Sequence, residues 1–362
     1  MRGADPERVR AAVESGDPLP GTRGFAGPLD GGFVRDVLGR VPIYTERADP
    51  TTWAFDPTDL GDPDPVPAGH RRTSDGDERL WSLPELGQFP DRRTAVSAVR
   101  QAVTASVDSV NEQGLAVAFS GGLDSAILAT RLDAPLYVAG FPESHDVAAA
   151  RSAATLLERD LTVVELSPER LEAAVPKVAR ATGRTNAMDT QIALPLFLVA
   201  ERAAADGYDR LAVGQGADEL FGGYAKVERA PTDPRVAADT VRGARDEMVA
   251  TLPDQLGRDT LALGGAGVEP VAPLLDDRVV RAALSLPGDM LVSARGERKW
   301  ALRLAARGSV PDGIAFREKK AVQYGSGVAR ELDRLARQAG FKRRQDDHVG
   351  RYVAARLEEG PG

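Results

Sequence analysis

The stretch Ala116-Val-Ala-Phe-Ser-Gly-Gly-Leu-Asp-Ser125 decides the fold of this chain. The apolar run Leu115–Phe119 is too short for a helix and predicts a buried parallel strand, and Leu123–Leu132 predicts the helix that follows it. Gly121 and Gly122 have no Cβ, so the backbone can bend sharply there and approach a ligand, while N–H groups at the helix start point outward. We therefore predict a phosphate-binding loop between the strand and the helix.

The side chains of this loop fit the same prediction. Ser120 and Ser125 add hydroxyl donors, and the carboxylate of Asp124 is suited, beside phosphates, to act as a Mg²⁺ ligand. A P-loop nucleotidase would place a lysine directly after its glycines, whereas the first lysine of this chain is Lys177. The alternative interpretation, an ordinary strand-to-helix turn, applies to the loop taken alone.

Two motifs carry a resemblance to a known family. The segment Ser120–Ser125 resembles the PP-loop of the ATP pyrophosphatases, which split ATP into AMP and pyrophosphate. The segment Gly214-Gln-Gly-Ala-Asp-Glu-Leu-Phe-Gly-Gly-Tyr224 is similar to the second signature of the asparagine synthetase family. A helix start with Asp218 as a cap is the alternative for the second motif alone. The two matches in this order favour the family over either alternative.

The resemblance implies a set of site residues. It implies Mg²⁺ ligation by Asp124 and Asp218, and catalytic roles for Lys299, for Asp259 as its partner, and for Gln215. Lysine is scarce in a chain that otherwise uses arginine, so a lysine kept at position 299 is informative. Lys226, Arg317 and Lys320 are weaker candidates for pyrophosphate binding. The residues expected to bind ATP or pyrophosphate are Ala118, Ser120, Gly121, Gly122, Asp124, Ser125, Ala139, Val213, Gly214 and Lys299.

Two departures from the family affect the second half of the reaction. Gln215 stands where asparagine synthetases carry a glutamate placed to handle the proton of the incoming amine, and an amide cannot act as a general base. Val271 replaces an arginine that is usual in the segment around Glu269, which loosens the inference that aspartate is the substrate. Gln215 can still position a ligand by hydrogen bonding.

Composition excludes several classes of function. The chain has 362 residues, a formal net charge of −8 and no cysteine, so disulfides, zinc–thiolate sites and a cysteine nucleophile are excluded. The negative charge argues against broad capture of nucleic acid. The first residues lack the apolar core of a signal peptide, and no run of about 18 apolar residues could span a membrane. We expect a cytoplasmic protein without nucleic-acid or membrane partners.

The chain is expected to have two domains. Residues 1–93 are rich in turns and short strand patterns, Arg79–Ser82 among them, and they predict a small β-rich domain that ends in a linker at residues 90–93. The segments Phe33–Tyr44 and Pro67–His70 resemble the later half of a glutaminase domain. In the family that domain uses an N-terminal cysteine, whereas Arg2 follows Met1 here, so the resemblance implies a truncated remnant without glutaminase chemistry.

Residues 94–362 are expected to form the synthetase domain. Strand and helix patterns alternate from Leu115 to Gly214, which predicts an α/β fold with a doubly wound parallel sheet, followed by a mostly helical part. Ligands of such sheets lie outside the carboxyl ends of the strands, where both motifs fall.

The resemblance implies an ATP-dependent ligase that adenylates a small-molecule carboxylate, by default aspartate, and captures it with ammonia, which is taken up free or supplied by a separate protein. Two alternatives stay open: an enzyme like the β-lactam synthetases, in which the amine belongs to the same substrate, and a binding protein that retains the nucleotide fold without catalysis. Gln215 and the missing glutaminase half mildly favour the binding protein, whereas the intact Ser120–Ser125, Asp218 and Lys299 count against it.

Overall fold

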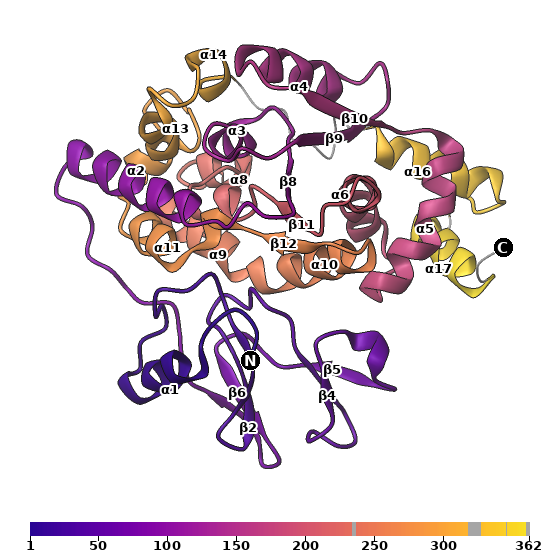
Figure 1. The fold of residues 1–362 in the computed structure, drawn as a ribbon, viewed down its shortest axis with the longest axis horizontal. Helices are drawn as coiled ribbons and strands as arrows, with labels where there is room; N and C mark the ends of the chain where they lie inside the picture. The colour runs from indigo at the N-terminus through magenta and orange to yellow at the C-terminus, as the bar shows by residue number, and fades with distance from the viewer. Residues whose placement is uncertain (234–236, 318–326, 345, 360–362) are drawn as a thin grey trace. The chain divides into compact units, whose positions relative to one another are not determined.

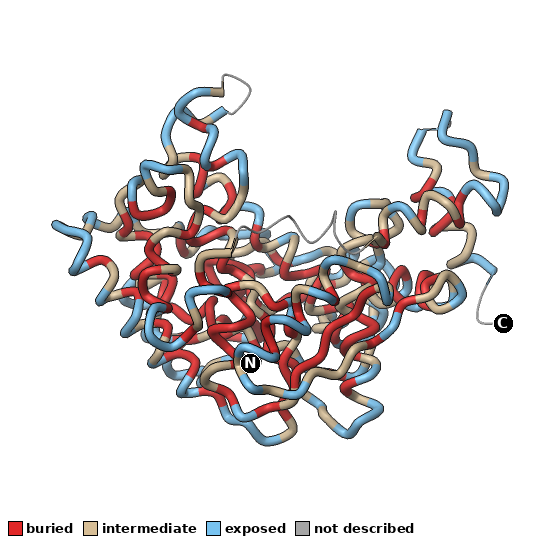
Figure 2. Tube along the Cα trace, turned by 90° about the horizontal axis from the view of Figure 1, so that it is seen from above, coloured by how far each residue is buried: buried red, intermediate tan, exposed pale blue. Residues whose placement is uncertain are grey.

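The computed structural model describes residues 1–233, 237–317, 327–344 and 346–359 (Figure 1). Packing divides the chain into two compact units, each assembled from three stretches of sequence. The first unit comprises Met1–Val110, Gly214–Gly257 and Ala272–Gly308. The second comprises Asn111–Val213, Arg258–Val271 and Ser309–Gly362. Buried residues, red in Figure 2, occur in all of these stretches.

The second unit is built on a five-stranded sheet with the order β10-β9-β8-β11-β12, in which every neighbouring pair is parallel. This arrangement confirms the predicted α/β class. The strands are β8 (Leu115–Ala118), β9 (Leu136–Gly140), β10 (Leu161–Glu165), β11 (Arg210–Ala212) and β12 (Glu269–Val271).

Helices connect these strands as the alternating pattern predicted. Helices α3 and α4 lie on one face of the sheet and α6 lies on the other, as Figure 1 shows. The helices of this unit are α3 (Leu123–Ala129), α4 (His145–Leu156), α5 (Pro168–Thr182), α6 (Ala187–Ala205), α14 (Asp312–Ala315), α16 (Val328–Gln338) and α17 (His348–Glu358). Helix α10 (Leu252–Gly265) begins in the first unit and ends in the second.

Successive strands are added to the sheet in opposite directions on the two sides of the boundary between β8 and β11, although all strands are parallel. From β8 the chain moves to β9 and β10, then crosses back to β11 on the other side of β8 and continues to β12. The carboxyl ends of two neighbouring strands whose connections run in opposite directions form the ligand-binding edge of open α/β sheets. The first glycine-rich motif follows β8, and the second follows β11.

The first unit contains two small antiparallel sheets, with the orders β1-β2-β6-β7 and β4-β3-β5. Their strands are β1 (Ala26–Leu29), β2 (Gly32–Arg35), β3 (Tyr44–Glu46), β4 (Trp53–Ala54), β5 (Pro63–Pro65), β6 (His70–Thr73) and β7 (Gly76–Arg79). A β-rich N-terminal region is thus present as predicted. The strand expected at residues 79–82 is wrong, because β7 ends at Arg79.

Helices complete the first unit. Helix α2 (Arg92–Asp108) packs against α11 (Asp277–Leu284) and α13 (Trp300–Ala306). The remaining elements are α1 (Pro6–Ser15), η1 (Pro57–Asp59), α7 (Ala217–Leu220), α8 (Ala225–Arg229), α9 (Val241–Ala250), η2 (Pro273–Leu275) and α12 (Gly288–Leu291). Within the described part of the chain, no helix is both long and apolar enough to cross a bilayer.

Candidate active site

The loop after β8 is a tight bend that only glycine permits. Gly121 has φ 70°, and a Cβ there would lie 2.7 Å from the Cα of Ala150 and 2.8 Å from the carbonyl oxygen of Ala149. Both neighbours are backbone atoms at the middle of α4, so they cannot move aside as a side chain could. The sequence correctly predicted a sharp bend here, and its cause is the close passage of the loop over α4.

The two serines of the loop face each other. The Oγ atoms of Ser120 and Ser125 lie 3.3 Å apart, and the Oγ of Ser125 donates to the carbonyl of Gly122 at 3.2 Å. The N–H of Gly122 donates weakly to the Oγ of Ser120 at 3.4 Å. Because hydroxyl protons rotate, both serines can turn a donor toward an anion. Asp124, 8% exposed, lies in the first turn of α3.

An arginine from the C-terminal part of the second unit contacts this loop. The Nη2 atom of Arg317 donates to the carbonyl of Gly121 at 2.5 Å, and its Nη1 donates to the carbonyl of Ala149 at 3.4 Å. The guanidinium therefore bridges the loop and α4. Lys320, another pyrophosphate candidate, lies outside the described residues.

The other predicted ATP-binding positions of this unit lie at the sheet. Ala118 is the last residue of β8, and Ala139 lies in β9, which hydrogen-bonds to the loop through Phe119 N–H and the carbonyl of Tyr137 at 2.7 Å. Val213 follows β11, and its N–H donates to the carbonyl of Val271 at 2.9 Å.

In the first unit, Asp218 of the second motif forms an ion pair with a buried lysine. Asp218, in the first turn of α7, accepts a hydrogen bond from the ammonium of Lys299 at 2.7 Å. Lys299 is 4% exposed and has φ 57°, a left-handed conformation that is uncommon for lysine, directly before α13. Two residues that lie 81 positions apart and that the resemblance marked separately are thus brought together.

Glycine at position 223 lets the ion pair form. A Cβ at Gly223 would lie 2.0 Å from Oδ1 of Asp218 and 2.5 Å from Cε of Lys299. The carbonyl of Gly223 accepts from Nη1 of Arg298 at 2.7 Å, and its N–H donates to the carbonyl of Asp218 at 2.7 Å. The turn is therefore wrapped around the carboxylate and the lysine stem.

Gly214 and Gln215 are the first two residues of this motif, and both are partly exposed. Gly216, at φ 87°, precedes α7, and a Cβ there would lie 2.3 Å from Cδ2 of Leu275. The motif therefore rests against the η2 turn.

A family comparison fits these observations. The sequence model of the asparagine synthase family, "Asparagine synthase", matches residues 97–246 and 233–357. The chain belongs to the asparagine synthase family. It is 30% identical over 299 residues to asparagine synthetase 1 (glutamine-hydrolyzing) of Methanocaldococcus jannaschii, covering 73% of this chain and 54% of that protein.

Further relatives are glutamine-hydrolyzing asparagine synthetases of bacteria and plants. Asparagine synthetase B of Escherichia coli is 26% identical over 260 residues, covering 66% of this chain and 46% of the relative. Asparagine synthetase 1 of Arabidopsis thaliana is 24% identical over 328 residues, covering 82% and 55%. The chain spans about half the length of the curated relatives that it matches.

Asp259 was expected, as an asparagine synthase residue, to partner Lys299. Asp259 lies on α10 in the second unit, is 8% exposed and accepts from Nε of Arg258 at 2.7 Å. The same guanidinium donates through Nη1 to Asp189 at 3.0 Å. The pairing with Lys299 remains a prediction.

Two residues of the asparagine synthase motif received no role from the sequence. Glu219 is 5% exposed, and the hydroxyl of Tyr224 donates to its Oε1 at 2.5 Å. Burial raises the pKa of Glu219 above its ordinary value. A glutamate that directly follows Asp218 and precedes a tyrosine by five residues is the sequence signal that could have identified this pair.

Asp124 and Asp218 are the candidate ligands of a metal ion. In the residues that the structure describes, no three histidine, aspartate or glutamate side chains gather as a metal site. Asp124 and Asp218 are hard oxygen donors of the kind that Mg²⁺ takes when phosphate oxygens complete its shell. Their chemistry therefore fits a metal that arrives with a nucleotide.

Proposed function

We propose that this chain is an ATP-dependent carbon–nitrogen ligase of asparagine synthase type. A carboxylate oxygen of the substrate attacks the α-phosphorus of ATP, the bond from that phosphorus to the α,β-bridging oxygen breaks, and pyrophosphate leaves. An amine nitrogen then attacks the acyl-adenylate, AMP leaves with the electrons of the carbon–oxygen bond, and the nitrogen loses a proton. The observation that carries this proposal is the pair of glycine-rich motifs after β8 and β11, at the reversal of strand order.

The loop after β8 supplies neutral donors for the phosphates. Ser120 and Ser125, with Oγ atoms 3.3 Å apart, can turn both hydroxyl protons toward an anion without moving the backbone. Gly121 lets the loop pass close over α4, where a Cβ would meet the backbone of Ala149 and Ala150. Because Arg317 and α4 already hold the loop, little reorganisation is needed when charge develops.

Lys299, which is held by Asp218 of the second motif, supplies positive charge for the departing pyrophosphate. The ammonium of Lys299 is buried and oriented by Asp218, so it is a compact positive charge in a fixed position. We propose Asp124 and Asp218 as Mg²⁺ ligands, each within its own unit. Bound Mg²⁺ would neutralise part of the phosphate charge during departure.

The amine step uses different groups from those of the relatives. Gln215 offers an amide for positioning but cannot accept the proton of the amine. The proton must therefore be lost before attack or pass to another group. With ammonia as the acceptor, turnover should rise with pH as the neutral fraction grows, and Gln215→Glu should lower the ammonium concentration needed.

The nitrogen source is inferred from residues 1–93 and from the composition of the chain. We propose that residues 1–93 form a small domain similar to the later half of a glutaminase domain and that residues 94–362 form the ligase region. Because the 362 residues contain no cysteine, we expect free ammonia, or a separate protein that supplies it, as the nitrogen source. Efficient glutamine-dependent amidation by the purified chain alone would contradict this expectation.

A direct test of the function uses the purified chain with ATP, Mg²⁺ and a panel of amino acids, with aspartate as the first choice. The expected products are AMP and pyrophosphate, formed only with the correct carboxylate, and an amide when ammonium is present. ADP and orthophosphate as products would refute the cleavage between the α and β phosphates. A panel without any nucleotide turnover would favour the non-catalytic alternative.

Gln215 and Val271 favour one second candidate, an enzyme whose amine belongs to the same substrate, as in the β-lactam synthetases. Val271 is a buried residue of β12, 6% exposed, and it offers no charge for an aspartate carboxylate. Indifference of turnover both to ammonium and to Gln215→Glu would support this candidate over asparagine synthesis.

A further inference from the structure

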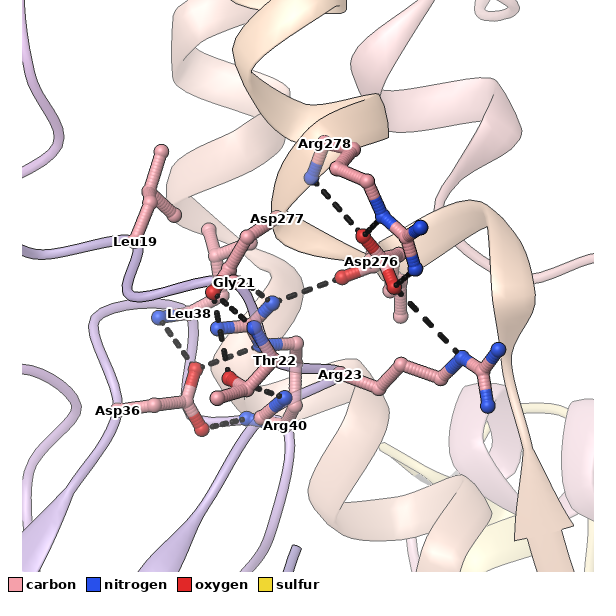
Figure 3. Close-up of polar contacts among 12 residues, drawn as sticks. Leu19, Gly21, Thr22, Arg23, Asp36, Leu38, Arg40, Asp276, Asp277 and Arg278 are labelled. Carbon is pink, nitrogen blue, oxygen red and sulfur yellow. Dashed lines mark hydrogen bonds and ion pairs between the residues drawn. The ribbon is translucent and has the colours of Figure 1, made fainter. Parts of the chain in front are cut away.

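A buried arginine of the N-terminal region lies at the centre of an ionic cluster (Figure 3). Arg40 is 6% exposed; its Nε donates to Asp36 at 2.8 Å, and its Nη1 donates to Asp277 at 2.7 Å. Asp277 also accepts from the backbone N–H of Thr22 at 2.7 Å. Burial alone would lower the pKa of Arg40, but the two carboxylates reverse that effect, so the guanidinium stays charged.

The same guanidinium contacts the η2 turn. Nη1 of Arg40 donates to the carbonyl of Leu275 at 2.8 Å, across 235 residues of sequence. From the other end of the turn, Oγ of the fully buried Ser106 in α2 donates to the carbonyl of Pro273 at 2.6 Å. The turn is therefore held by two side chains from the first 110 residues, and both act on its backbone.

The η2 turn also supports the second motif. The side chain of Leu275 is 1% exposed and packs against Gly216, close enough that a Cβ at Gly216 would lie 2.6 Å from its Cγ. Gly216 directly precedes α7, the four-residue helix that carries Asp218. If the backbone of the turn shifts at Leu275, either the start of α7 must move or the leucine side chain must change its conformation, because the packing leaves no gap.

We propose that Arg40 is a positioning residue for the second motif. Through the carbonyl of Leu275 it fixes η2 against Gly216, and thereby sets where Asp218 and Lys299 lie. The inference gives the N-terminal region a part in the ligase site even without glutaminase chemistry. Its catalytic consequence rests on the proposed function, whereas its structural consequence does not.

Arg40→Lys tests the proposal, because lysine keeps the charge but cannot reach both aspartates and the carbonyl of Leu275 with one ammonium. Arg72→Lys is the matched control. Arg72 is a buried arginine of the same unit that also joins two aspartates, Asp64 at 2.9 Å and Asp77 at 2.7 Å. None of its described contacts is to η2. Both variants should lower the melting temperature.

The first readout is amide hydrogen exchange over residues 214–224, which needs no activity. We expect Arg40→Lys to speed exchange there by about 3- to 30-fold, the range typical of mutations that loosen a connected element. Arg72→Lys should leave exchange in this segment unchanged. Unchanged exchange in Arg40→Lys, or an equal change in both variants, would overturn the proposal.

The second readout separates positioning from loss of fold. At a temperature at which each variant is fully folded, Arg40→Lys should raise the KM for Mg·ATP by a similar factor, whereas Arg72→Lys should not. If the parent chain shows no nucleotide turnover, the proposed function fails, while the exchange comparison still decides the positioning role.

Leu275→Ala provides a second route if Arg40→Lys does not fold. It removes the side chain that touches Gly216 and leaves the ionic cluster of Arg40 intact. Leu275→Ala alone should speed exchange over residues 214–224, and unchanged exchange there would contradict the proposal. Where Arg40→Lys does fold, the double variant should show no faster exchange in this segment than Leu275→Ala alone, because Arg40 acts through Leu275. Additive effects of the two substitutions would contradict the proposed order of contacts.

Discussion

Gly223→Ala should displace Asp218 from Lys299 and also lower the melting temperature, because the added Cβ would lie 2.8 Å from the Cα of Asp218. The added Cβ would lie 2.0 Å from Oδ1 of Asp218, and ordinary contacts of such a carbon begin near 3.4 Å. The carboxylate must therefore retreat by about 1.4 Å, which stretches its 2.7 Å contact with the lysine ammonium beyond hydrogen-bonding distance. A misplacement of about 1 Å in a catalytic group typically costs about 10²-fold in rate.

The assay is ATP-dependent pyrophosphate release, measured beside a thermal melt. Gly264→Ala is the control, because a Cβ at that helical position meets no atom within 4 Å. The control should keep its turnover and gain up to about 1 kcal/mol of stability, since alanine is a better helix residue than glycine. Parental turnover in Gly223→Ala would refute the reasoning that the ion pair is placed by this glycine.

Three further predictions concern charge. Asp124→Asn and Asp218→Asn should each lose Mg²⁺-dependent turnover while the melt is retained, and unchanged turnover in both would place the metal elsewhere. Lys299→Arg should be nearly as damaging as Lys299→Ala, about 10²- to 10³-fold in turnover, because a planar fork cannot replace a buried ammonium; near-parental activity would reduce Lys299 to a general positive charge. Arg343, helped by His348 and Arg337, lowers the pKa of Asp333. A carboxyl group whose pKa is lowered by folding stabilises the protein above the unfolded pKa of about 3.9, and this stability is lost as the pH falls below that value. Asp333→Asn should therefore lose less stability than the parent between about pH 4 and pH 2 in acid-unfolding measurements. Equal slopes of stability against pH in the parent and the variant would contradict this.

The sequence predicted best where local pattern and tertiary structure agree. The apolar run at Leu115 and the two following glycines predicted β8 and the loop, because a buried parallel strand is apolar on both faces. Helix α5 begins and ends at residues whose types signal helix ends: Ser167 accepts from the N–H of Arg170, and Gly183 adopts the left-handed conformation.

Elements without a local pattern were missed or misplaced. Strand β12 has three residues with Pro270 at its centre, and it is recognisable only through its pairing with β11. All four residues of β7 are exposed, so no alternation of apolar and polar residues marked the strand, and the prediction fell three residues too late.

Part of the candidate site also lay beyond the reach of sequence. The motifs pointed to Asp218 and Lys299 separately, but nothing local indicated that the two side chains meet. The contact of Arg40 with the η2 turn depends on the packing of segments more than 230 residues apart. Such a contact leaves no trace in spacing or periodicity.

The interleaved assembly of the first unit imposes an order on biosynthesis. Arg40 and its partner Asp277 are 237 residues apart, and the unit is not complete before residue 308 has been made. At translation rates of roughly 5–20 residues per second, the N-terminal strands wait about 12–50 s for the helix that neutralises their buried arginine. During this interval the side chain of Arg40 lacks Asp277 and the carbonyl of Leu275, and a guanidinium without these partners is costly to bury. Ribosome-bound chains that end near residue 213 should therefore depend on chaperones, whereas release of the complete chain should remove that dependence.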